Sequence, residues 1–144
     1  IIGDGKKFKK LKKQILKLKL NKRVTIHKGL SNTSKFTMIK EADIFLMCSR
    51  SRAESFGIAI LEAISVGLPL VISNIKGSGM NDMIRNNYNG YKFKNLSSID
   101  CSKKILKLSK SLYKLNLFSK NSLRLFNIKF NDKKIESKLK KIYN

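Results

Sequence analysis

The hydrophobic positions along the chain alternate between a helical spacing and short strand-like runs. Apolar residues three and four apart, with lysines between them, predict a first helix through Phe8, Leu11, Ile15 and Leu18. Further helices are predicted at 31–42, 56–67, as a short helix at 79–87, and in two or three segments from Ser98 onward. Strands are predicted at 23–29, 43–48, 68–73 and 91–93. The unbroken apolar run at 43–48 is typical of a strand covered on both faces.

Strands and helices that alternate in this way predict an α/β fold with a mainly parallel sheet flanked by helices. Ligands bind such sheets at the carboxyl ends of the strands, near a switch in strand order. The most polar and glycine-containing loops follow the predicted strands: "GDG", "GLSNTS", "SRSRAESFG" and "SNIKGSG". We therefore expect the functional site at this edge of the sheet.

Length and composition indicate one globular domain over residues 1–144, with 42% hydrophobic residues and a single proline. The first residue is Ile1, and "II" resembles the end of a strand, so we expect a fragment of a longer protein. No apolar run reaches the roughly 20 residues of a membrane span. Cys48 and Cys101 lie far apart without a metal-ligand pattern, which favours a reducing, cytoplasmic setting.

The net charge of +23 is carried by the two flanks of the chain, because acids and bases balance between residues 40 and 90. In the flanks, lysines interleave with Leu and Ile at helical spacing, as in "GKKFKKLKKQILKLKLNKR". The simplest interpretation is solvated helix faces. An anionic membrane surface or a nucleic acid is the alternative partner, and exposed aromatics beside clustered lysines would favour the nucleic acid.

Two carboxylates flank the start of the helix predicted in "CSRSRAESFGIAILEA". Glu54 falls in the loop after a strand, and Glu62 lies about a turn and a half into the helix. The first backbone N–H groups of a helix, together with its dipole, suit a phosphate, and Gly57 lets an anion approach where a Cβ would obstruct it. A carboxylate on each side would suit the hydroxyls of a nucleotide sugar. Alternatively, Glu54 is a helix-terminal charge and Glu62 a solvated helix residue.

The stretch "EADIFLMCSRSRAESFGIAILEAISVGLPLVISNIKGSG" resembles the C-terminal half of GT-B glycosyltransferases of the glycosyl transferases group 1 family. These are retaining enzymes that use nucleotide-activated sugars. The resemblance continues through "IIGDG", "VTIHKG" and "GSGMNDMIRNNYNGYKF" to the closing helix, so it covers essentially the whole chain. It implies a Rossmann-like domain, truncated at its N-terminus, that binds the donor. The matching positions are Ala42, Asp43, Ser49, Glu54, Phe56, Gly57, Glu62, Ala63, Gly67 and Pro69.

The resemblance also implies roles for individual residues. Glu54 would contact the donor sugar and support the transition state, which makes it the candidate catalytic residue, and Glu62 would bind the ribose. The N–H groups of Phe56, Gly57 and Ile58 would hold the diphosphate, and the turn at 29–31 would lie against the base. The implied donor-binding residues are Gly3, Gly5, Gly29, Leu30, Ser31, Glu54, Ser55, Phe56, Gly57, Ile58 and Glu62. No metal and no cofactor is implied, since the nucleotide-diphosphate sugar is the substrate.

The sequence departs from the family pattern in three respects. The segment with the family's phosphate-binding Arg and Lys, and the N-terminal acceptor domain, lie before Ile1, and Asp82 stands where glutamate is common. We expect Arg50 and Arg52 to be loop residues near the acceptor cleft. The implied acceptor is a glycan or a lipid-linked sugar, which allows peripheral contact of the lysine-rich 9–19 helix with the cytoplasmic membrane face. A non-catalytic remnant that docks on membranes, or a nucleic-acid-binding module, are the alternatives.

Overall fold

The computed structural model describes residues 1–52 and 57–130. The chain divides into two compact units, residues 1–38 and residues 39–144, and each is described by itself.

The first unit consists of helix α1 and two extended segments. The predicted first helix is confirmed as α1, Phe8–Lys17. The predicted strand at 23–29 does not form, and one parallel bridge joins Ile2 to His27. Its first residues are tied into a turn instead, because the N–H groups of Arg23 and Val24 both donate to the Leu20 carbonyl. None of residues 1–38 is buried.

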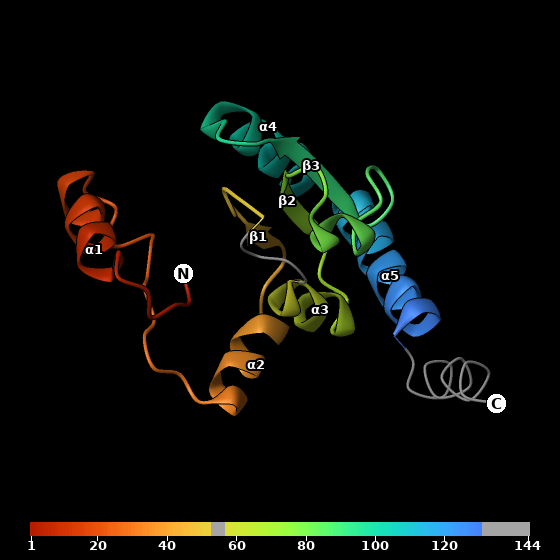
Figure 1. The fold of residues 1–144 in the computed structure, drawn as a ribbon, viewed down its shortest axis with the longest axis horizontal. Coiled ribbons are helices and arrows are strands. Elements are labelled where there is room, and N and C mark those ends of the chain that lie inside the picture. Colours follow the sequence, from red (N-terminus) through yellow and green to blue (C-terminus); the bar gives the residue numbers. More distant parts are fainter. Residues whose placement is uncertain (53–56, 131–144) are drawn as a thin grey trace. The chain divides into compact units, whose positions relative to one another are not determined.

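The second unit contains a three-stranded parallel sheet with helices on both faces (Figure 1). This confirms the predicted fold class. The strands lie in the order β1-β2-β3, and α2 begins in the first unit and ends in the second. The elements are α2 (Asn32–Lys40), β1 (Phe45–Met47), α3 (Ile58–Ser65), β2 (Leu70–Asn74), the 3-10 helix η1 (Gly79–Asp82), β3 (Gly90–Lys94), α4 (Ser98–Ser109) and α5 (Leu112–Lys129).

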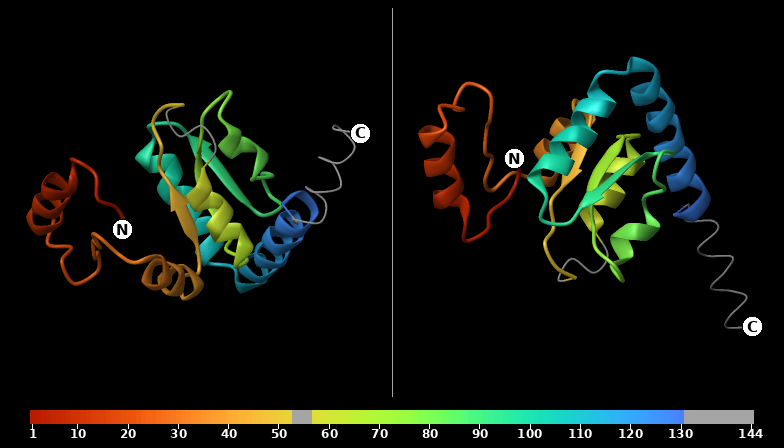
Figure 2. Two further views of the ribbon diagram at one scale, coloured as in Figure 1. Left: turned by 60° about the horizontal axis from the view of Figure 1, so that its bottom comes forward. Right: turned by 90° about the horizontal axis from the view of Figure 1, so that it is seen from above.

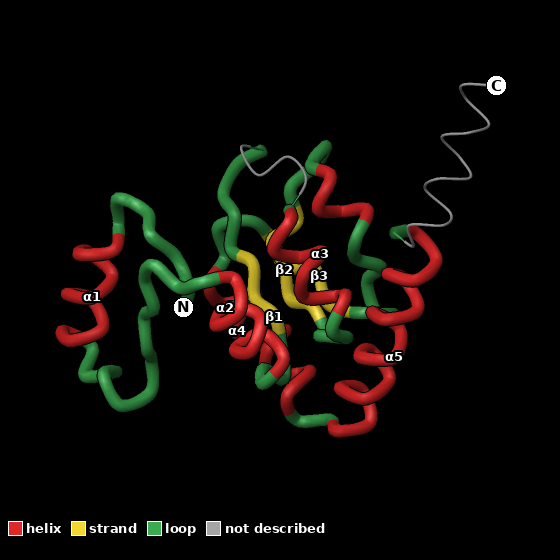
Figure 3. Tube along the Cα trace, turned by 90° about the horizontal axis from the view of Figure 1, so that it is seen from below, coloured by secondary structure: helices red, strands yellow, loops and turns green. Residues whose placement is uncertain are grey.

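Alternate residues of β2 point to the two faces of the sheet and build two hydrophobic clusters. On one face, Leu70 and Ile72 pack with the buried side of α3. On the other face, Val71 packs with α4 and with Phe118 of α5. The helices α3 and α4 therefore cover opposite faces of the sheet, while α5 contacts both of these helices (Figures 2 and 3).

Two predicted elements differ from the structure. The strand at 43–48 is shorter than expected and is not covered on both faces, because β1 is an edge strand of the described sheet and Leu46 is 44% exposed. The helix predicted at 79–87 is reduced to η1, because the buried Asn89 side chain forms hydrogen bonds with backbone groups of the residues that follow η1. Its Oδ1 accepts from the Arg85 N–H at 2.8 Å, and its Nδ2 donates to the Met83 carbonyl at 3.0 Å.

Candidate functional site

The loops at the carboxyl edge of the sheet are bonded to one another. Ser73, at the end of β2, donates its hydroxyl to the Ser49 carbonyl at 2.6 Å. Asn95, just after β3, donates to the Arg50 carbonyl at 3.1 Å. These bonds fix the loop that leads from β1 toward α3 against the neighbouring strands.

Arg52 adds a third connection and places a positive charge at this edge. Its Nε donates to the Lys76 carbonyl at 2.9 Å. The guanidinium lies so close to Gly77 that a Cβ there would be 3.0 Å from the Arg52 Cζ, and Gly77 has φ of +72°. This contact was not predicted, and the one signal in the sequence that could have pointed to it is the glycine in the next loop. Arg52 thus joins the loops after β1 and β2.

Gly57 starts α3 in a left-handed conformation, with φ of 77° and ψ of 53°. Its carbonyl accepts from the Ile60 N–H at 2.8 Å and from the Leu61 N–H at 3.1 Å. A Cβ at this position would meet Met80 at 3.1 Å and Ile60 at 3.2 Å, so it would point into the core. Backbone conformation and packing therefore already require glycine at this position, and its role in letting an anion approach stays a prediction.

The first turn of α3 is accessible from solvent, since Ile58 is 65% exposed. The N–H groups of Ile60 and Leu61 already donate to the Gly57 carbonyl, but those that precede them at a helix start have no acceptor within the helix, and the dipole makes this end electropositive. Glu62 is half-buried one turn further along α3, and its backbone carbonyl accepts from the Ser65 hydroxyl at 2.7 Å. The predicted residues Glu54, Ser55 and Phe56 lie outside the described residues.

The remaining predicted residues lie in the first unit, where the bridge between Ile2 and His27 brings together the two turns that contain glycine. The Gly3 N–H donates to the His27 carbonyl at 3.0 Å, and Asp4 pairs with Lys28 at 3.1 Å. Positions Gly3, Gly5 and Gly29 all have open space where a Cβ would stand, and Gly29 has φ of 63°.

In the first unit, Ser31 serves as a helix cap. Its Oγ accepts from the Ser34 N–H at 3.1 Å near the start of α2. The structure thus groups the predicted residues in two sets: 3–5 with 29–31 in the first unit, and Gly57, Ile58 and Glu62 in the second.

The two cysteines are poor nucleophiles at neutral pH. Burial, together with the neighbouring Cys48 and Asp100, raises the pKa of the Cys101 thiol to about 11. Burial also raises the pKa of Cys48, although a side-chain hydrogen bond with Cys101 lowers it in part. Both side chains are therefore neutral thiols at pH 7 and contribute no charge to the carboxyl edge.

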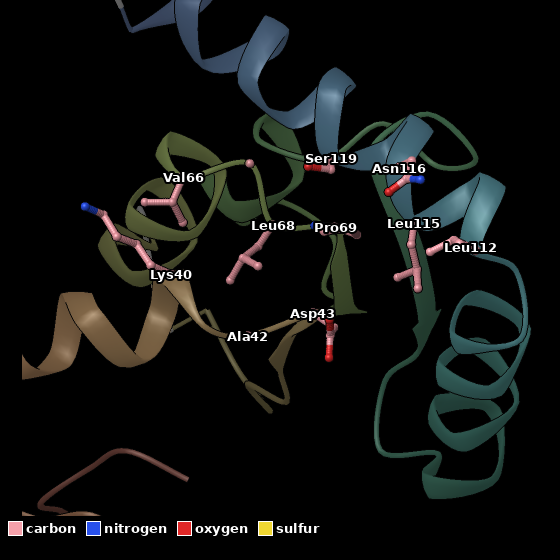
Figure 4. Close-up of a pocket in the computed structure, with 11 residues that line it drawn as sticks. Lys40, Ala42, Asp43, Val66, Leu68, Pro69, Leu112, Leu115, Asn116 and Ser119 are labelled. Atoms are coloured by element: carbon pink, nitrogen blue, oxygen red, sulfur yellow. The ribbon is translucent and has the colours of Figure 1, made fainter.

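A cavity of about 240 Å³ lies at the opposite, amino edge of the sheet (Figure 4). It is lined by residues that lead into β1 and β2 and by the first turns of α5, among them Asp43, Pro69 and Asn116. None of the predicted donor-binding residues lines it. Across residues 1–52 and 57–130, no three His, Cys, Asp or Glu side chains gather as a metal site would require. No helix in the same ranges is long and apolar enough to cross a membrane.

Comparison with known proteins assigns the chain to a family. The model of the family "Glycosyl transferases group 1" matches residues 1–124, and the chain belongs to this family. The fold is accordingly the Rossmann-like C-terminal half of GT-B glycosyltransferases.

Two curated relatives carry specific names. The chain is 33% identical over 144 residues to the UDP-Gal:alpha-D-GlcNAc-diphosphoundecaprenol alpha-1,3-galactosyltransferase of Escherichia coli, a match that covers 99% of this chain and 35% of that protein. It is 36% identical over 93 residues to the GtfA subunit of the UDP-N-acetylglucosamine--peptide N-acetylglucosaminyltransferase of Streptococcus agalactiae, covering 63% of this chain and 17% of that protein. The chain thus spans about a third or less of these relatives.

Solved structures share the fold. Anabaena HepE in complex with UDP superposes with a TM-score of 0.82 at 21% identity, covering 94% of this chain and 36% of that one. A glycosyltransferase from Rickettsia africae gives a TM-score of 0.85 at 21% identity, with coverages of 99% and 38%.

Proposed function

We propose that this chain is the donor-binding half of a retaining glycosyltransferase that transfers a sugar from a nucleotide-diphosphate sugar to an acceptor. The observation that carries the proposal is the family match over residues 1–124, which includes the whole "AESFGIAILEA" motif at the start of α3. An accessible first helical turn at the carboxyl edge of a parallel sheet is a favourable place for a diphosphate.

The proposed roles follow the chemistry of each group. The N–H groups of Phe56, Gly57 and Ile58 bind the diphosphate, and the Glu62 carboxylate accepts hydrogen bonds from the ribose. Glu54 contacts the donor sugar and stabilises the transition state. Catalysis of this kind works through positioning and through stabilisation of the departing nucleotide diphosphate. By the resemblance, Gly3 and Gly5 would shape a phosphate-side turn, and Gly29, Leu30 and Ser31 would form the turn against the base.

Arg52 is a further candidate for the electrostatic part of this work. Its guanidinium is fixed at the carboxyl edge by the bond to Lys76 and by contact with Gly77. A cation held in this way can offset the charge that develops on a leaving diphosphate. We propose that the reaction needs no metal, which predicts that EDTA leaves donor binding unchanged.

The proposed acceptor is a glycan or a lipid-linked sugar at the cytoplasmic face of a membrane. The E. coli relative is named for a diphosphoundecaprenol acceptor, which is lipid-linked. The excess of lysine would favour peripheral contact with anionic lipid.

Calorimetric titration of the purified chain with UDP, GDP and their sugar conjugates tests the proposal. We expect one nucleotide to bind, and Glu62→Ala to weaken it by tenfold or more, because a hydrogen bond to a charged group contributes about 1.5–3 kcal/mol. Glu41→Ala is the matched control, since Glu41 is an exposed acid outside the proposed site. Equal weakening by both substitutions, or no binding by the folded chain, would contradict the donor role.

A further inference from the structure

The exposed side of α4 carries apolar and basic side chains in one row. Ile99, Lys103, Leu106 and Lys110 follow one another at spacings of four, three and four residues, which places them along one helix face. Ile99 is 69% exposed and Leu106 is 53% exposed. The row extends over roughly 16 Å at 1.5 Å per residue.

The first turn of α5, which follows α4 directly along the chain, also carries exposed apolar side chains. Leu112 is 73% exposed and Tyr113 is 74% exposed, and both follow Lys110 within three residues. Side chains of this size are the core-forming residues of most proteins, yet the core side of α4 is already supplied by Cys101 and Leu108. The exposed row is therefore not needed for the packing of the second unit.

The stretch of chain that carries most of this row is strongly basic. From Cys101 to Phe130 the sequence contains no Asp or Glu. Asp100, next to Ile99, accepts a hydrogen bond from the Lys94 N–H at 2.7 Å, and Asp43 lines the same cavity as Leu112. The basic residues of this stretch are Lys103, Lys104, Lys107, Lys110, Lys114, Lys120, Arg124 and Lys129.

We propose that the α4 row, defined as Ile99, Lys103, Leu106 and Lys110 together with Leu112 and Tyr113, is a docking surface for an anionic lipid membrane. Aliphatic side chains enter the boundary between headgroups and acyl chains, lysine stems extend so that the ammonium reaches the phosphates, and tyrosine is favoured at that boundary. This inference rests on the proposed function, because a lipid-linked acceptor would require the enzyme to work at a membrane. A nucleic acid fits the row less well, because Tyr113 is the one member with an aromatic face on which a base can stack, and the other three apolar members are aliphatic.

The inference places the membrane contact on α4, whereas the sequence pointed to the lysines of α1. Both helices carry exposed leucines beside lysines, since Leu16 of α1 is 59% exposed and Leu106 of α4 is 53% exposed. On α1, however, Phe8 and Ile15 are partly covered within their own unit and help to line an apolar cavity there. The row on α4 begins with Ile99 at 69% exposure and is followed along the chain by two side chains that are more than 70% exposed, so its apolar members are the more exposed.

Vesicle sedimentation with the full chain tests the docking surface. We expect binding to phosphatidylcholine vesicles that contain a quarter phosphatidylglycerol, and none to pure phosphatidylcholine. Each lysine near an anionic surface contributes roughly fivefold to partitioning, so Lys103→Gln with Lys110→Gln should lower it by about 25-fold. Ile99→Gln with Leu106→Gln should lower it at least as much, because burial of each aliphatic side chain in the interface is lost.

The control is Lys9→Gln with Lys13→Gln, which removes the same charge from exposed positions of α1. Equal losses from the α1 and α4 pairs, or full binding by the Ile99/Leu106 variant, would overturn the proposal. The proposal would also be overturned if the α4 changes left vesicle binding unaltered but abolished binding to a single-stranded oligonucleotide. UDP titration of the same variants keeps the two proposals apart, since the α4 changes leave the donor-binding residues intact.

Discussion

Asn89 offers a sharp test of how the segment that leads into β3 is held. Its side chain is fully buried and bonds to the Arg85 N–H at 2.8 Å and to the Met83 carbonyl at 3.0 Å. Asn89→Ala leaves both backbone groups without these partners. Because a buried group left unsatisfied costs about 1–3 kcal/mol, we expect the free energy of unfolding to fall by about 2–4 kcal/mol.

Urea unfolding followed by circular dichroism measures this change. Asn86→Ala is the matched control, because the exposed Asn86 side chain makes one bond, to the Lys92 N–H at 3.1 Å. We expect that control to cost under about 1 kcal/mol. If Asn89→Ala costs no more than Asn86→Ala, with unchanged denaturant dependence in both, the argument that Asn89 organises residues 83–90 is refuted.

Three further predictions test other parts of the second unit. Gly57→Ala should destabilise the fold by about 1–3 kcal/mol in the same urea assay, because alanine must adopt φ of 77°; a smaller effect would show that the helix start relaxes readily. Ser122→Ala should cost about 1–3 kcal/mol, since the buried hydroxyl donates to the Leu68 carbonyl at 2.8 Å, and a neutral result would exclude this bond as a stabilising contact. The pKa of Cys101, raised to about 11, predicts that its alkylation rate, followed by peptide mass spectrometry, keeps rising between pH 8 and 10, whereas levelling near pH 9 would indicate an ordinary thiol.

The sequence predicted the sheet best where local pattern and tertiary packing agree. Leu70, Val71 and Ile72 form an apolar run that is buried on both faces, so β2 could be located from the sequence alone. The neighbouring run at 43–48 looks equally apolar, but β1 is an edge strand and leaves Leu46 exposed. A composition signal cannot distinguish a central strand from an edge strand, because that difference depends on partners distant in the chain.

The candidate site was predictable as a motif but not as a set of contacts. Gly57 and Glu62 were selected from their spacing; Glu62 lies on α3, and Gly57 is the residue directly before it. The role of Arg52 was not visible in the sequence. Its contacts with the Lys76 carbonyl and with Gly77 join two loops, and Arg52 and Lys76 are 24 residues apart in the chain. Likewise, the shortening of the helix predicted at 79–87 depends on the hydrogen bonds of the Asn89 side chain.

The position of α5 has a consequence for synthesis of the protein. This helix supplies Phe118 to one hydrophobic cluster and packs Phe126 against the other, and its Asn121 donates to the Tyr88 carbonyl at 2.8 Å. Both faces of the sheet therefore stay incompletely covered until the ribosome has released the chain beyond about residue 126. Nascent chains that stop earlier would expose apolar surface, which favours aggregation and proteolysis. A chaperone would meet this unit with both faces of its sheet incompletely covered, and α5 would supply the missing cover.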